Sequence, residues 1–201
     1  MEIYPTYSDF DVFKHTYYIT KEVTLTGAIV ECGVAAGSNF AQMIKASIDS
    51  DIDRQYYGFD SFEGIPYGIA CDVEQPGIGV MNKDKYGILE STGISSHNKE
   101  GVIENLVKWN VMNDNVHLIE GWFQNTLSKT DTGKISVLRL DGDLYESTKV
   151  CLEVLYPKVE KGGLIIIDDY ELAGCKKAVH DYIKGKRVKL QRYKYTAFWY
   201  K

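Results

Sequence analysis

Five short apolar segments alternate along the chain with segments that have the spacing of amphipathic helices, and this alternation most constrains the fold. The apolar segments span residues 27–33, 55–60, 115–121, 135–141 and 162–170. The helical patterns span residues 38–50, 99–110, 147–159 and 175–185. Alternating strands and helices are typical of a mainly parallel sheet covered by helices. Two further strand patterns, residues 187–193 and 196–200, predict an antiparallel hairpin at the end of the sheet.

The remaining segments divide the chain into an approach segment, one domain and a long loop. Residues 1–26 are rich in Tyr and Phe and predict a helical approach segment that packs on the domain. Residues 27–201 then form one α/β domain. Within it, residues 61–97 are rich in Gly and polar residues, and a loop of this length inside a compact domain is typical of a lid or binding loop.

Composition argues against several classes of partner. The net charge of -5 disfavours nucleic acid, and we interpret the basic residues of 184–194 as a solvated edge rather than a binding patch. No apolar run has the length of a membrane span, and no secretory signal pattern is present. The four cysteines are scattered without a C-x-x-C pair, so free thiols of a cytoplasmic protein are favoured over disulfides or a zinc site.

Acidic residues follow two of the apolar segments at the point where each segment ends. "LRLDGDLYESTK" places Asp141 after the fourth segment, and "GGLIIIDDYE" places Asp168 and Asp169 after the fifth. Ligands of open α/β sheets bind at the carboxyl ends of the strands. Three carboxylates gathered there would repel one another, and Mg²⁺, which takes oxygen ligands, removes that repulsion. The sequence therefore predicts a magnesium site, with helix capping as the alternative, which suits Asp143 well.

A glycine-rich turn follows the first apolar segment. In "ECGVAAGS" the backbone passes from Gly33 to Gly37 and enters a helix at Ser38, with Glu31 before the turn. Glycines allow the main chain to approach a ligand closely. The turn lacks the second early glycine of a dinucleotide motif and the lysine of a P-loop, so the alternative is a tight strand–helix turn with no ligand.

Two other strand ends carry candidate binding residues. Asp60 ends the second segment, where nucleotide-binding folds bind a ribose, although a turn cap is the alternative. Glu120 and Trp122 follow the third segment and could frame a purine ring, although a lone Trp is more often a core residue. The roles of His97 and His180 in proton transfer stay open, and the absence of a G-x-S-x-G motif disfavours a hydrolase of that type.

These motifs together resemble the macrocin-O-methyltransferase family of S-adenosylmethionine-dependent enzymes that methylate sugar hydroxyls. The matching stretches are "VECGVAAGSN", "GFDSFEGIP", "EGWFQNTL" and the long segment from "LRLDGDLYEST" through "GGLIIIDDY", together with the closing aromatic strand. The combination of "LDGDLYEST" with "IIDDY" is specific, whereas the glycine turn alone is not. The chain is short at its N-terminus compared with the family, and most of residues 66–97 do not align with it.

The resemblance implies a Rossmann-like class I methyltransferase with a seven-stranded mixed sheet and helices on both faces. It places the methionine part of the cofactor at the turn from Gly33 to Ser38, the ribose at Asp60 and the adenine near Trp122. The cofactor-binding residues that we expect are Glu31, Gly33, Gly37, Ser38, Asp60, Ser61, Glu120, Gly121, Trp122 and Asp141. The expected metal ligands are Asp141, Asp168 and Asp169, and Asp141 is also the candidate general base.

The expected reaction is methyl transfer from S-adenosylmethionine to a sugar hydroxyl, with Mg²⁺ orienting and acidifying that hydroxyl. The expected partner is a small-molecule sugar acceptor, nucleotide-linked or attached to a glycan, and homo-oligomer formation is left open. One alternative keeps the chemistry and changes the acceptor to a catechol-like phenol. A second alternative is a non-catalytic, S-adenosylmethionine-binding subunit of a biosynthetic complex. The acceptor and the hydroxyl that is methylated are not defined by the sequence.

Overall fold

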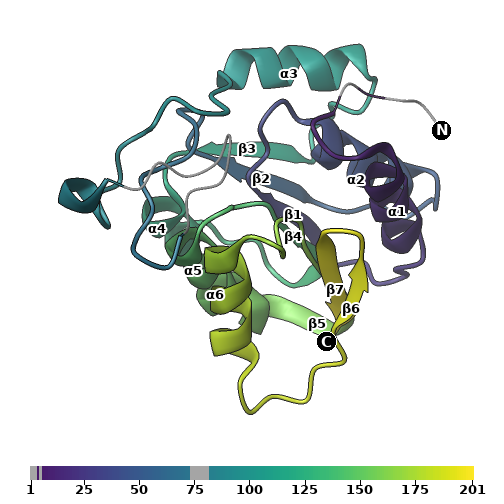
Figure 1. Cartoon of the computed structure of the whole chain (residues 1–201). Helices are drawn as coiled ribbons and strands as arrows, with labels where there is room; N and C mark the ends of the chain where they lie inside the picture. Colours follow the sequence, from purple (N-terminus) through teal and green to yellow (C-terminus); the bar gives the residue numbers. More distant parts are fainter. Residues whose placement is uncertain (1–3, 5, 73–81) are drawn as a thin grey trace.

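The strands form one seven-stranded mixed sheet. Figure 1 shows helices on both faces of this sheet. This computed structural model describes Tyr4, residues 6–72 and residues 82–201. The strands are β1 (Ala28–Cys32), β2 (Tyr56–Asp60), β3 (Val116–Glu120), β4 (Ile135–Leu140), β5 (Val159–Ile167), β6 (Gln191–Tyr193) and β7 (Thr196–Tyr200). Their spatial order is β3-β2-β1-β4-β5-β7-β6. The first five strands are parallel and β7 is antiparallel to both of its neighbours, which confirms the predicted sheet.

Two hydrophobic layers pack against the sheet because successive residues of each strand point to opposite faces. The helices are α1 (Phe10–Lys21), α2 (Ser38–Ile48), α3 (Lys99–Lys108), α4 (Phe123–Thr126), α5 (Tyr145–Leu155) and α6 (Ala173–Ile183). Residues of α1, α2 and α3 form one core with Ile29 and Val137 of the sheet. Residues of α5 and α6 form the other core with Val30 and Leu138.

The boundaries of α5 and β5 differ from the sequence prediction. The helix that follows β4 begins at Tyr145 rather than at residue 147, and it passes into a 3₁₀ turn at Tyr156–Lys158, which contains Pro157. Proline lacks the N–H that an α-helix needs in its interior. Strand β5 begins at Val159 rather than at residue 162, because Val159 pairs with Ile135 across an irregularity in the ladder.

Within the N-terminal approach segment, residues 10–21 form helix α1, which packs on the domain. Asp9 is the N-cap of helix α1, and its carboxylate accepts the N–H groups of Asp11 and Val12. The hydroxyl of Tyr17 donates to Asp49 at the end of α2, at 2.6 Å. The long predicted loop, residues 61–97, contains residues 73–81, which lie outside the described residues, and a 3₁₀ turn at Lys83–Lys85. No helix among the described residues combines the length and apolar character needed to cross a membrane.

Candidate active site

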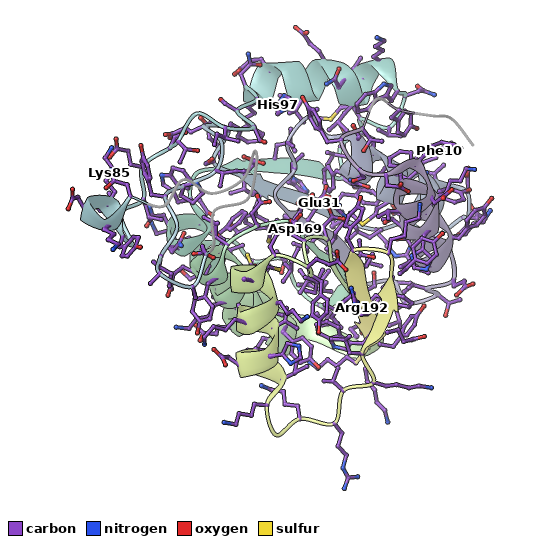
Figure 2. All side chains as sticks on the ribbon, in the orientation of Figure 1. Phe10, Glu31, Lys85, His97, Asp169 and Arg192 are labelled. Carbon is purple, nitrogen blue, oxygen red and sulfur yellow. The ribbon has the colours of Figure 1, made fainter. Side chains whose placement is uncertain are left out.

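A cavity of about 410 Å³ opens at the carboxyl ends of β1, β2, β4 and β5. Figure 2 places Glu31 and Asp169, which both line this cavity, in the centre of the view, whereas Lys85 lies at the periphery. Most of the predicted site residues line the cavity: Glu31, Gly33, Ser38, Asp60, Ser61, Trp122, Asp141, Asp168 and Asp169. A volume of this size is within the range of small-molecule and cofactor sites.

The turn after β1 has a backbone that requires glycine at Gly33. This residue has a φ of 88°, and a Cβ built on it would lie 1.8 Å from the carbonyl oxygen of Asp141. The main chains of the first and fourth strand ends therefore touch at this point. Gly37, with a φ of 90°, forms the N-cap of α2 but does not line the cavity. Gly33, Val34, Ala35 and Ser38 of the turn line the cavity, and the missing side chain of Gly33 lets the turn lie directly against the end of β4.

Asp60 supports this turn. One carboxylate oxygen accepts the N–H groups of Val34 and Ala35 at 2.8 and 3.0 Å, and the other accepts the N–H of Phe62 at 2.8 Å. Burial raises the pKa of Asp60, and these three backbone donors oppose that effect. An ionised carboxylate has about four lone-pair positions. Three donors therefore leave Asp60 with capacity to accept one more hydrogen bond from the cavity that it lines.

A buried arginine joins the carboxylates of three strands. Arg139 has no exposed side-chain surface, and its guanidinium lies 2.5 Å from Glu31, 2.8 Å from Asp141 and 2.7 Å from Asp168. Burial lowers the pKa of Arg139, but the charges of Asp168, Asp141 and Glu31 outweigh that effect and raise it. Burial also raises the pKa of Glu31 to about 8, against the opposing charge of Arg139. One cation thus compensates three carboxylates only in part.

A second group of carboxylates lies beside this arginine. Oxygen atoms of Asp141, Asp143 and Asp169 all lie within 4.8 Å of one another. Burial, followed by the charge of Asp141, raises the pKa of Asp143 to about 8, and burial with the charge of Asp143 raises that of Asp169. One buried oxygen of Asp169 has no hydrogen-bond partner within the described part of the chain. Converging carboxylates with an unpaired buried oxygen suit a hard divalent cation.

This cluster differs from the predicted metal ligands in one member. Asp143, which the sequence favoured as a helix cap, lies in it with a φ of 56°. Asp168 instead forms the ion pair with Arg139, and burial raises its pKa to about 6. Asp168 still lines the cavity, together with the three aspartates of the cluster. All four aspartates therefore face one space.

The N-terminal segment supplies a wall of the cavity that the sequence did not predict. Thr6, Tyr7, Ser8 and Asp9 line it together with Tyr195 of the β6–β7 turn. The hydroxyl of Tyr195 accepts the N–H of Asp9 at 2.9 Å, so the two ends of the chain meet at this wall. Nothing in the sequence pattern links segments that lie so far apart.

Several predicted residues lie outside the cavity. Glu120 and Gly121 do not line it, and the carboxylate of Glu120 is largely exposed, 3.8 Å from the amine of Lys99. The hydroxyl of Tyr170 lies 2.7 Å from Nε2 of His180, which is not a cavity residue. His97 contacts the ring of Tyr7 at the rim, with 5.7 Å between centroids.

Comparisons with known proteins agree with this architecture. A sequence model of the family described as macrocin-O-methyltransferase (TylF) matches residues 12–201. An 8-demethyl-8-(2,3-dimethoxy-alpha-L-rhamnosyl)-tetracenomycin-C 4'-O-methyltransferase from Streptomyces olivaceus is 38% identical over 163 residues, which are 78% of this chain and 58% of that protein. A demethyldecarbamoylnovobiocin O-methyltransferase from Streptomyces niveus is 36% identical over 158 residues, which are 78% of this chain and 58% of that protein.

Solved structures share the fold. The structure of the O-methyltransferase NovP has a TM-score of 0.79 and 29% identity, and the match covers 94% of this chain and 79% of that one. The calicheamicin methyltransferase CalS11 has a TM-score of 0.75 at 19% identity, covering 94% and 77%, which indicates a common fold alone. The chain spans a little under three fifths of the length of the two Streptomyces relatives.

Proposed function

Because the chain belongs to the macrocin-O-methyltransferase (TylF) family, we propose that it is an S-adenosylmethionine-dependent O-methyltransferase acting on a sugar hydroxyl in a glycan or natural product. The observation that carries the proposal is the single cavity that joins the glycine turn after β1 to the acidic ends of β4 and β5. Relatives named for methylation of a rhamnosyl-tetracenomycin and of a novobiocin precursor support a sugar-bearing acceptor.

We propose that the cofactor lies against the turn between Gly33 and Ser38. Residues of this turn line the cavity, and Asp60 retains one accepting position for a ribose hydroxyl. Trp122 lines the cavity and supplies an aromatic surface for the adenine. The complete proposed set is Glu31, Gly33, Ser38, Asp60, Ser61, Trp122 and Asp141, which line the cavity, together with Gly37, Glu120 and Gly121, which do not. In this arrangement the sulfonium methyl is an electrophile that needs mainly to be aligned, and alignment can supply about 7–11 kcal/mol of the barrier.

We propose that Asp141, Asp168 and Asp169 hold a magnesium ion. The donor set fits, because all three line the cavity and Asp169 has a buried oxygen with no partner within the described part of the chain. Mg²⁺ would orient the acceptor hydroxyl and make it more acidic. Arg139 holds Asp141 and Asp168 through one oxygen each, which leaves the second oxygen of each carboxylate for the cation.

Two carboxylates are candidates to accept the proton of the hydroxyl. Asp141 is the one expected from the sequence, but Arg139 already occupies one of its carboxylate oxygens at 2.8 Å. Asp143 lines the same cavity and has no ion pair among the described residues. We therefore propose Asp143 as the base, with Asp141 as the alternative.

Methyl transfer to a panel of acceptors tests this function. The purified protein is incubated with S-adenosylmethionine, Mg²⁺ and either sugar-bearing natural products, nucleotide sugars or catechols, and the products are identified by mass spectrometry. Addition of one methyl group to a sugar supports the proposal. Transfer only to catechols would change the acceptor class, and tight cofactor binding without transfer to any acceptor would indicate a non-catalytic subunit.

Metal dependence tests the magnesium site separately. Exhaustive chelation is expected to abolish transfer, and added Mg²⁺ is expected to restore it. Full activity after chelation would exclude a metal role while leaving the methyltransferase assignment intact.

We also propose a cytoplasmic location, because the four cysteines are free and three of them are buried, as in proteins of reducing compartments.

A further inference from the structure

We propose that Asp72 is a positioning residue that fixes the cavity-lining loop to the two turns carrying the catalytic aspartates. Asp72 lies in the loop that begins at Ser61, as the last described residue before 73–81, and it is 4% exposed. One carboxylate oxygen accepts the N–H of Tyr145 at 2.8 Å, and the other accepts the N–H of Ile69 at 2.8 Å. The inference rests on the proposed function of the cavity.

Asp72 supplies a cap that α5 does not provide for itself. The residue at the N-cap of α5 is Leu144, and that of α6 is Leu172; neither side chain makes a capping hydrogen bond. The first N–H groups of a helix have no partner within the helix. A carboxylate at that position also interacts favourably with the helix dipole. Asp72 therefore completes the start of α5 from a segment 73 residues away in the sequence.

The carboxylate of Asp72 lies in a notch between the first turns of α5 and α6. A Cβ built on Gly174 of α6 would lie 1.7 Å from Oδ1 of Asp72 and 3.0 Å from the backbone nitrogen of Tyr145. A Cβ built on Gly68 would lie 2.9 Å from that of Asp72. The absence of side chains at Gly68 and Gly174 therefore makes room for this contact.

The two helices that meet at Asp72 follow the two acidic strand ends. The turn with Asp141 and Asp143 leads directly into α5, and the turn with Asp168 and Asp169 leads into α6. The loop that carries Asp72 also contributes Ser61, Gly64, Ile65 and Pro66 to the cavity. The buried carboxylate of Asp72 thus links a loop that lines the cavity to the first turns of α5 and α6, which follow the acidic strand ends. Supporting residues of this kind hold ligands and catalytic groups in the geometry that the reaction needs.

Two substitutions break this contact from opposite sides. Asp72→Ala removes the carboxylate, whereas Gly174→Ala leaves it intact and fills its position. Alanine is a better helix former than glycine, so Gly174→Ala does not weaken α6 itself. We expect each variant to increase hydrogen exchange at the Tyr145 amide, and to lower both kcat and the affinity for Mn²⁺ about 10–100-fold. The KM for S-adenosylmethionine and the affinity for S-adenosylhomocysteine stay unchanged, and the double variant is no worse than the more severe single one.

Asn98→Ala is the matched control. Oδ1 of Asn98 accepts the N–H of Gly101 at 2.7 Å and caps α3, which carries none of the acidic residues of the site. Its loss is expected to lower thermal stability comparably without changing Mn²⁺ affinity. If Asp72→Ala frees the Tyr145 amide but otherwise behaves like Asn98→Ala, Asp72 is a structural cap only and the inference is wrong.

Other outcomes separate this inference from the proposed function. A Tyr145 amide that stays protected in both variants would show that the contact does not exist, whatever the activity. A wild-type protein that transfers no methyl group would overturn the proposed function, while Mn²⁺ affinity and amide exchange would still decide the role of Asp72. A wild-type protein that binds no Mn²⁺ would overturn both the metal site and the role of Asp72 in supporting it.

Discussion

Glu31 of β1 and Arg139 of β4 are partners in the register of two central parallel strands, and their side chains form a fully buried ion pair of 2.5 Å. The same guanidinium reaches Asp141 and Asp168 at the ends of β4 and β5. Arg139 therefore connects the end of β1, where we propose that the cofactor binds, to the acidic ends of β4 and β5. Because buried charges require compensation, Glu31 and Asp168, whose side chains are buried, depend on this residue.

Arg139→Met is expected to lower the free energy of unfolding by about 3–5 kcal/mol, because removing one partner of a buried ion pair leaves its carboxylates uncompensated. Urea denaturation in the absence of divalent ions measures the effect. Arg54→Met is the control: Arg54 is also buried, but it donates to the carbonyl oxygens of Val23 and Leu25, which are neutral. An equal cost for the two variants would contradict the role assigned to Arg139.

Glu31→Gln is expected to become more stable relative to the wild type as the pH rises. Burial raises the pKa of Glu31 from 4.5 to about 8, so the folded state binds a proton more tightly than the unfolded state. The resulting stabilisation is complete below pH 4.5 and is lost as the pH rises to about 8. Glutamine does not titrate, so the difference in the free energy of unfolding between Glu31→Gln and the wild type changes by up to about 1.4 kcal/mol per pH unit in this window.

The measurement for Glu31 is urea denaturation at several pH values without divalent ions. Glu153→Gln, which removes a negative charge from the exposed side of α5, is the control for the loss of one charge. A difference between Glu31→Gln and the wild type that does not vary with pH would show that Glu31 is ionised alike in both states.

The sequence predicted the sheet because its signal is local. Buried strands are continuous apolar runs and their helices have a regular stripe, so the order of elements followed from periodicity. The acidic ends of β4 and β5 were predicted to meet for the same reason, since parallel neighbours share an edge. What the sequence did not predict depends on contacts between distant segments.

Arg139, Asp143 and Asp72 show the limit. Arg139 lies within an apolar strand segment, and its role was not predicted. The signal that could have identified it is Glu31, an opposite charge within another apolar strand segment, because buried charges are usually paired. Asp143 was interpreted as a helix cap, and this local role gave no reason to predict it as a member of the acidic cluster. Helix α5 begins earlier than predicted because its cap comes from Asp72, and no local pattern identifies a partner 73 residues away.

Gly33→Ala is expected to abolish cofactor binding, because its Cβ would lie 1.8 Å from the carbonyl oxygen of Asp141 and the turn would have to move. Calorimetry with S-adenosylhomocysteine measures the loss. Gly133→Ala is the control, since Gly133 also has a positive φ, 62°, but its Cβ would meet nothing within 4 Å. That variant isolates the backbone strain of about 1–2 kcal/mol. Normal binding by Gly33→Ala would mean that the turn does not hold the cofactor.

Asp168→Asn and Asp143→Asn distinguish a metal ligand from a base among the four aspartates. If Asp168 is a ligand, Asp168→Asn removes a charged oxygen ligand of the cation. We then expect the affinity for Mn²⁺ to fall by more than the roughly 10–100-fold that is typical of a supporting residue. If Asp143 accepts the proton, Asp143→Asn lowers kcat by about 10²–10⁴-fold while Mn²⁺ affinity is retained. Calorimetry and initial rates on the same preparations separate the two effects. The opposite result, with affinity lost in Asp143→Asn and retained in Asp168→Asn, would make Asp141, Asp143 and Asp169 the ligands, as their mutual distances within 4.8 Å also permit. Asp168 would then serve only to neutralise Arg139, and proton transfer would return to Asp141.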